Sequence, residues 1–150
     1  MKNSLTTAVA LAVAFAAFAP PTSAKDGKMG GTAVLAPAGD IVWSDVPDFP
    51  GLKMAALEGD PAKGSSHFLL KLPDGFAAPL HHHSTDHFVT VLSGTLVLAV
   101  DGKETMLPAG SFFMFKGMKQ HTTRVAPGAD CVLSMDARGK WDVVMEAAAK

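Results

Sequence analysis

Four of the six histidines in this 150-residue chain lie close together, at His81, His82, His83 and His87. Successive side chains of an extended strand point to opposite faces, so His81 and His83 share one face and His82 points to the other. Two neutral imidazoles on one face can bind a single metal ion when other strands supply the remaining ligands, and imidazole suits Zn, Cu, Fe and Ni. The cluster therefore predicts a metal site, in preference to a solvated surface cluster or an adventitious metal-binding loop.

His121 is the candidate ligand from another strand, because it begins an extended run further along the chain. Thr123 has the same strand parity as His121, so we expect it to face the same pocket, with Arg124 facing solvent. His87 keeps the parity of His81 and His83 if the chain between them stays extended, although a loop there would break this count. We interpret His67 as an ordinary strand residue.

The elements that must position these side chains are strands. From Ile41 onward, short apolar runs alternate with Gly, Pro and Asp, a pattern typical of an all-β sandwich or barrel. The expected strands cover 41–43, 53–58, 66–71, 88–92, 95–100, 104–107, 112–115, 121–125, 131–137 and 142–146, with a further short strand at 32–35. Asp101-Gly102 predicts a two-residue hairpin turn. Phe88, Phe112, Met114 and Phe115 are expected to form the core and the pocket lining, with strand alternation deciding which of them face the pocket.

The N-terminus predicts export. An apolar run over Ala8–Ala19 follows a positively charged start, and Pro20 and the small residues up to Ala24 end it, which is the layout of a secretory signal peptide. The run is too short to span a bilayer as a mature helix, and the alternative is an uncleaved membrane anchor. We expect a signal peptide over 1–24, a flexible lead over 25–40 and a single domain over 41–147. The mature protein is then periplasmic or secreted, with no membrane contact.

Composition excludes several classes of protein. Lys+Arg 13 against Asp+Glu 14 gives a net charge of −1, which argues against a nucleic-acid binder, since such proteins need a basic face. The single cysteine excludes an intrachain disulfide framework. Cys131 lies in an apolar run and is interpreted as a buried thiol, with an intermolecular disulfide or a soft metal ligand as alternatives. A hydrophobic share of 48% suffices for one buried core.

Two segments carry a family resemblance. The stretch GFAAPLHHHSTDHFVTVLSG (75–94) resembles the first cupin motif, G(X)5HXH(X)3-4E(X)6G, with His87 where the motif has glutamate. The stretch GKETMLPAG (102–110), followed by His121, resembles the second motif, G(X)5PXG…H, with Gly117 where proline is common. The runs LPAGSFF and CVLSMDARGKWDVV are similar to those of small exported single-domain cupins of uncharacterised function.

The resemblance implies a jelly-roll β-barrel that holds one metal at its mouth. His81, His83 and His121 match the three histidine ligands of cupins, and His87 falls on the position of the glutamate ligand. A fourth imidazole leaves the site more cationic than a carboxylate would, so we expect one divalent transition metal, Zn, Fe, Cu or Ni, with Mn disfavoured. Asp86 could supply a carboxylate by a one-residue shift, although its parity points it away, and the position could also bind no metal.

The function expected from the resemblance is that of a metal-dependent enzyme on a small molecule, of dioxygenase, isomerase or lyase type. A non-catalytic periplasmic module that binds a metal or a small ligand is an alternative, as is a structural cupin with a stabilising metal. Fold alone does not select among these. A homodimer is compatible with the family, and an N-terminal strand within 32–43 could exchange between two copies.

Overall fold

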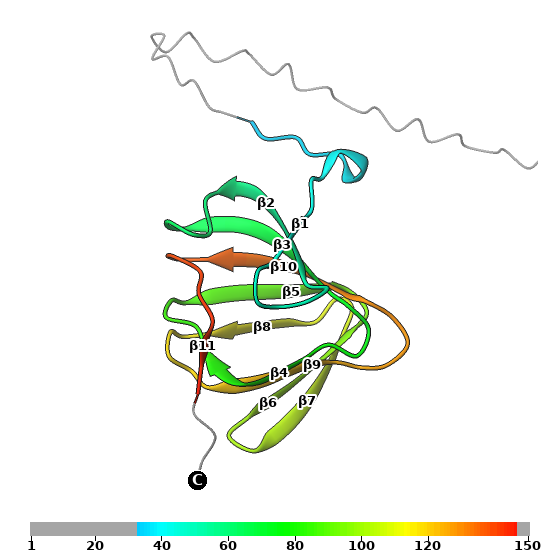
Figure 1. The fold of residues 1–150 in the computed structure, drawn as a ribbon, viewed down its shortest axis with the longest axis vertical. Helices are drawn as coiled ribbons and strands as arrows, with labels where there is room; N and C mark the ends of the chain where they lie inside the picture. Colours follow the sequence, from blue (N-terminus) through cyan, green and yellow to red (C-terminus); the bar gives the residue numbers. More distant parts are fainter. Residues whose placement is uncertain (1–32, 147–150) are drawn as a thin grey trace, which may run out of the picture. The chain divides into compact units, whose positions relative to one another are not determined.

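The computed structural model describes residues 33–146, so the expected signal peptide over 1–24 and the first part of the lead lie outside the described residues. The described chain forms two antiparallel β-sheets with one short 3₁₀ helix, η1 (Ala38–Asp40), before them (Figure 1). The all-β prediction is confirmed. Among residues 33–146 no helix has the length and apolar character to cross a membrane.

One sheet has six strands and the other has five (Figure 1). The six-stranded sheet runs in the order β1 (Ser44–Asp45), β2 (Lys53–Gly59), β3 (Ser66–Leu72), β10 (Cys131–Ala137), β5 (His87–Ser93) and β8 (Phe112–Phe115). The five-stranded sheet runs in the order β11 (Val144–Met145), β4 (Ala77–His82), β9 (His121–Val125), β6 (Thr95–Val100) and β7 (Lys103–Pro108). Strands distant in sequence are therefore neighbours in both sheets, as in a jelly roll.

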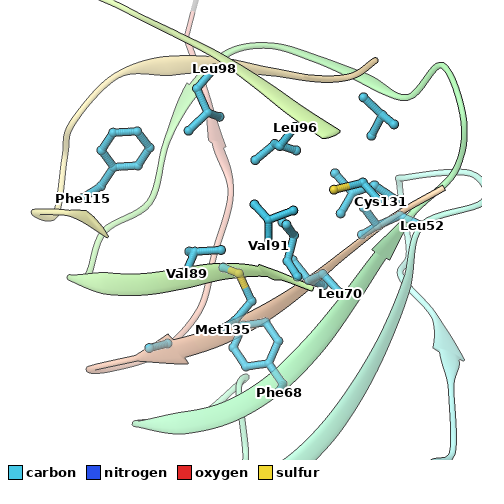
Figure 2. Packing of buried hydrophobic residues seen from close by; sticks show 14 residues of the cluster. Leu52, Phe68, Leu70, Val89, Val91, Leu96, Leu98, Phe115, Cys131 and Met135 are labelled. Carbon is cyan, nitrogen blue, oxygen red and sulfur yellow. The ribbon is translucent and has the colours of Figure 1, made fainter. Parts of the chain in front are cut away.

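The hydrophobic core lies between the sheets. Every second residue of β10 is buried, beginning with Cys131, because the pleat turns alternate side chains inward. Leu96 and Leu98 of β6 lie opposite Val89 and Val91 of β5 (Figure 2). Burial raises the pKa of the Cys131 thiol to about 11, so the residue acts as a small apolar side chain, as expected.

The hairpin turn at Asp101-Gly102 is present, and both residues have positive φ (51° and 78°), as the two-residue turn requires. Gly94 also has a positive φ, 72°, and a Cβ there would lie 2.5 Å from the Asp130 carbonyl oxygen. The cupin-like motif glycine at this position is therefore required by both backbone conformation and space.

Two of the expected N-terminal strands are wrong. Residues 33–35 and 41–43 are not strands, and the pairing with β2 begins only at Ser44, opposite Met54. Val42 is 80% exposed, so this apolar run has no sheet surface to cover. At the other end of the chain only Val144–Met145 pairs, within the longer strand expected over 142–146.

Candidate metal centre

Three histidine side chains meet in the interior. His81 and His121 are direct cross-strand partners on β4 and β9, with ring centroids 4.3 Å apart. His83 follows β4, and its ring lies 5.2 Å from that of His81 and 5.4 Å from that of His121. One ring nitrogen from each residue lies within 4.8 Å of the other two. Three nitrogens bound to one zinc ion lie about 3.3 Å apart, so modest closure of the rings would suffice to bind it.

A β-bulge on β4 turns the His81 side chain into the interior. Ala78 pairs with Thr123 and His81 pairs with His121, so three steps on β4 match two on β9. The extra residue resets the alternation, because Ala78 and His81 are both buried while the two residues between them are exposed. Without the bulge, the strand that carries Ala78 inward would turn His81 toward solvent.

Backbone carbonyls orient the rings of the three clustered histidines and of His87. The Nδ1 atoms contact the carbonyl oxygens of Pro79 (2.7 Å, from His81), Asp142 (2.5 Å, from His83), Thr85 (3.2 Å, from His87) and Lys119 (3.0 Å, from His121). A carbonyl can only accept, so each Nδ1 carries the proton and each Nε2 keeps its lone pair. This arrangement is the one that metal-binding histidines require, with the second nitrogen held by an outer partner. The donor set therefore fits a metal ion.

Burial keeps these imidazoles neutral. Desolvation, followed by mutual repulsion of the rings, lowers the pKa of His83 to about 3 and that of His121 to about 4, against hydrogen bonds to backbone that oppose the shift. Desolvation likewise lowers the pKa of His81 and of His87. Neutral imidazole is the ligand form, so at neutral pH the site needs no proton release before a metal binds.

His87 lies beside the three-histidine cluster, at the start of β5 in the opposite sheet. Its ring is 4.7 Å from that of His83 and nearly perpendicular to it (83°), and the residue is 2% exposed. Its nitrogens do not belong to the group that lies within 4.8 Å. The structure thus places His87 next to the site, and its role as a fourth ligand stays a prediction. The Asp86 carboxylate is bound elsewhere, to Lys116 Nζ (2.8 Å) and to the Gly117 amide (2.9 Å).

All four histidines also line a cavity of about 560 Å³ between the sheets. Thr123 lines the same cavity, as its parity with His121 predicts, while Arg124 is exposed and paired with Glu104. On β8, Phe113 faces this cavity and Phe112 is 59% exposed, so the alternation excludes Phe112 from the lining. A cavity of this volume is of the size that accommodates small ligands.

The comparisons with known proteins agree with this architecture. A family model described as the cupin domain matches residues 68–135. Residues 68–135 thus form a cupin domain. No curated protein gives a significant match.

Solved structures similar to this cupin share its fold at low identity. The polyketide cyclase RemF from Streptomyces resistomycificus superposes with a TM-score of 0.67 at 17% identity, over 79% of this chain and 89% of that one. An RmlC-like cupin from Ralstonia eutropha JMP134 gives 0.63 at 22% identity, over 77% and 74% of the two chains. A predicted oxalate decarboxylase from Thermotoga maritima gives 0.59 at 20% identity, over 70% and 98%.

Two histidines of this cupin lie outside the cavity lining. His82 does not belong to the three-histidine group, as strand parity predicts, but it is 8% exposed because the C-terminal segment covers it. Its Nδ1 lies 2.5 Å from Glu146 Oε1, and this contact is the main cause of the lowered pKa of the Glu146 carboxyl. His67 on β3 contacts the Ser134 hydroxyl of β10, at 3.1 Å, as an ordinary strand residue does.

The loop between His83 and His87 is held on both sides. The Ser84 amide and hydroxyl donate to the two carboxylate oxygens of Asp142, at 2.8 and 2.6 Å. On the other side, Gly117 packs so closely against the Ser84 carbonyl that a side chain there would collide with it. The motif position that often carries proline therefore needs the smallest residue here, and the loop presents both histidines in one fixed arrangement.

Trp141 is the site residue that sequence reasoning missed. Its ring stacks on His83 with centroids 3.9 Å apart and an interplanar angle of 21°, and it lies nearly perpendicular (88°) to the His87 ring at 5.1 Å. It also contacts Phe68, and its backbone N–H donates to the Pro61 carbonyl at 2.7 Å. Trp141 lies 58 positions after His83, and no spacing rule could have linked the two residues.

Proposed function

We propose that this cupin is a metal-dependent enzyme that acts on a small molecule by a reaction of dioxygenase, isomerase or lyase type. The observation that carries the proposal is the cluster of His81, His83 and His121, with their Nε2 lone pairs directed into a largely apolar cavity. Three protein ligands leave coordination positions for a substrate, which distinguishes catalytic from closed structural sites. Bound by these residues, a divalent transition metal would supply a Lewis acid that polarises a substrate oxygen.

The chain's own residues contribute binding and proton transfer. The apolar wall displaces water from a substrate, which strengthens the electrostatic interactions inside the cavity. His87 has a protonated Nδ1 and a free Nε2 lone pair, and its lowered pKa keeps it neutral. It can act as the fourth ligand, which we favour, and catalysis then requires that His87 dissociate to admit a substrate. Alternatively, it can act as a proton acceptor for a substrate hydroxyl held beside the cluster.

The metal content of purified variants tests the proposal. Protein prepared without metal-affinity resins is expected to contain about one divalent transition metal per chain by elemental analysis, within the set Zn, Fe, Cu and Ni. The variants His81→Ala, His83→Ala and His121→Ala are each expected to lose it, because the remaining imidazoles hold an ion too weakly. His82→Ala is the matched control and is expected to retain it, since His82 contacts Glu146 outside the cluster. Metal-free wild type, or equal loss from His82→Ala, contradicts the proposal.

The cobalt form resolves the role of His87. If His87 is a ligand, His87→Gln changes the visible absorption spectrum of the Co²⁺ protein, because one nitrogen leaves the coordination sphere. An unchanged spectrum with full cobalt content excludes His87 as a ligand and leaves the proton-acceptor role.

A non-catalytic metal-binding module is the second candidate. The observation that favours it is the fixation of all four rings by backbone carbonyls, together with the tightly held loop between His83 and His87. Such a site could bind a metal firmly without exchanging ligands. Azide added to the cobalt form separates the two candidates: a spectral change indicates an open coordination position, and its absence indicates a saturated site.

We also propose export through residues 1–24, on the strength of the apolar run and the small residues before Lys25. Expression of the full chain in a Gram-negative host, followed by mass measurement of the periplasmic protein, is expected to yield a chain beginning at Lys25. Recovery of full-length protein from the cytoplasm alone would contradict it.

A further inference from the structure

The wall of the histidine cavity has an unusual charge distribution. Within the described range 33–146, the residues that line it include three aspartates, Asp45, Asp48 and Asp142, and no lysine or arginine. Asp142 is already engaged with Ser84, and these hydrogen bonds lower the pKa of its carboxyl although burial opposes the shift. The described part of the wall therefore offers a substrate no lysine or arginine side chain, and its fixed charges are negative.

The rest of the wall is apolar. Leu70 of one sheet and Leu96 and Leu98 of the other contribute to it, together with Met135 (Figure 2). Phe113 and Trp141 add aromatic surface. Apart from the histidines, the polar side chain on a central strand of the lining is Thr123 of β9, whose hydroxyl can exchange a hydrogen bond with a substrate oxygen. One polar region and a large apolar region suit a molecule whose oxygen atoms are gathered at one end.

The cavity opens on the side of β1 and β2, because its exposed lining residues are 44, 45, 47, 48, Ala56 and Ala62. Asp45 and Asp48 stand at this opening, and Lys53 Nζ pairs with Asp45 at 2.6 Å. The local charge is thus negative even after this pair is counted. An anion would be repelled at the opening. Against the apolar wall it would lose its hydration without gaining a lysine or arginine partner.

We propose that the substrate of this site is a largely apolar molecule that presents oxygen donors at one end and carries no carboxylate or phosphate on the remainder; this inference rests on the proposed metal-dependent function. A metal attracts oxygen donors whatever their charge, so the selection acts on the part of the molecule that contacts the wall. Burial of a carboxylate against apolar side chains costs several kcal/mol when no cation pairs with it. Aromatic and alicyclic diols or hydroxyketones have the required chemistry.

Two matched probes test this inference by isothermal titration calorimetry on the zinc-loaded protein. One is 2,3-dihydroxynaphthalene, and the other is 6,7-dihydroxynaphthalene-2-carboxylate, which keeps the same pair of oxygen donors and adds a charge at the far end. We expect the uncharged diol to bind at least ~10-fold more tightly than the carboxylate. Equal or tighter binding of the carboxylate, or no binding of the diol, would overturn the inference.

A cation placed at the opening provides the complementary test. Ala56 is exposed and lines the opening, so Ala56→Arg adds a guanidinium there without disturbing the core. It is expected to tighten carboxylate binding about 10-fold and to leave diol binding unchanged, whereas Ala56→Gln, similar in length but neutral, changes neither. Ala77→Arg, on an exposed position outside the lining, controls for net charge. An equal gain from all three variants would overturn the inference.

The metal-dependent function and the substrate class are tested by separate results. Loss of the metal-dependent function appears as absent metal, or as diol binding that does not change when His81 is replaced. Failure of the substrate-class inference appears as a lost preference between the two probes in protein that holds its full complement of zinc.

Discussion

Acidification from pH 7 to pH 5 is expected to destabilise the metal-free protein through His83 and His121. Burial lowers the pKa of His83 to about 3 and that of His121 to about 4 in the fold, whereas both rise to the ordinary value of 6.5 when the chain unfolds. Between pH 6.5 and pH 4 the unfolded chain therefore binds two protons that the folded chain does not. The contribution of these two histidines to the free energy of unfolding is fully present above pH 6.5. It is lost as the pH falls toward their pKa values in the folded protein.

The size of the effect follows from the gap between pH 5 and the unfolded pKa. A gap of about 1.5 pH units corresponds to about 2 kcal/mol for each histidine, or about 4 kcal/mol for the two together. The lowered pKa values of His81 and His87 act in the same direction. The loss is a large fraction of the 5–15 kcal/mol that stabilises a typical domain, so the metal-free protein should be close to unfolding at about pH 5.

Urea denaturation of the mature protein in chelator, followed by circular dichroism at pH 7 and pH 5, measures this loss directly. His121→Gln removes one of the two titrating groups, so it is expected to lose about 2 kcal/mol less than the wild type over the same interval. For each protein, the unfolding free energy at pH 5 is subtracted from that at pH 7, and these two differences are compared. Any destabilisation by the substitution that is the same at both pH values then cancels. Equal unfolding free energies at pH 7 and pH 5 in the wild type, or the same loss in both proteins, would refute burial as the cause.

Three further predictions concern Trp141, Gly94 and zinc binding. Trp141→Ala removes the ring stacked on His83 and is expected to lower the unfolding free energy by about 3 kcal/mol, measured by urea denaturation, while Trp43→Ala, outside the cavity lining, costs less. Gly94→Ala is expected to cost about 2 kcal/mol or more, because its φ is 72° and the added methyl meets the Asp130 carbonyl; Gly102→Ala, also at positive φ but in open space, is the milder comparison in the same assay. Zinc at 100 times its dissociation constant is expected to stabilise the wild type by about 2.7 kcal/mol, seen as a higher midpoint in thermal unfolding, and His81→Ala is expected to show no such rise.

Most of the strands and the inward set of histidines could be predicted because they depend on local rules, although β4, which carries His81, is not among the expected strands. Strand alternation alone separates His81 and His83 from His82, and the structure groups them in this way. The turn glycines mark the strand ends, so β6, β8, β9 and β10 have the expected limits. The apolar run at 41–43 misled the prediction because propensity says nothing about whether a partner strand is present.

The remaining features of the site depend on register and tertiary contacts. The bulge on β4 is visible only when Ala78 and His81 are paired with their partners on β9. Trp141 reaches His83 because the Trp141 amide donates to the Pro61 carbonyl of a distant turn, a contact that no sequence spacing encodes. The absence of basic side chains from the lining, as far as residues 33–146 form it, is likewise a property of the assembled wall, since the chain as a whole is nearly neutral.

The carbonyl acceptors behind the rings make the site insensitive to the identity of the residues that provide them. Pro79, Thr85 and Lys119 each hold a histidine through a main-chain oxygen, which every amino acid possesses. A carboxylate in the same place would be lost with one mutation and would titrate, and a carbonyl does neither. Related cupins can therefore vary freely at these three positions and keep the same tautomers, provided that the path of the backbone is preserved. The constraint falls instead on the residues that shape that path, such as Gly117.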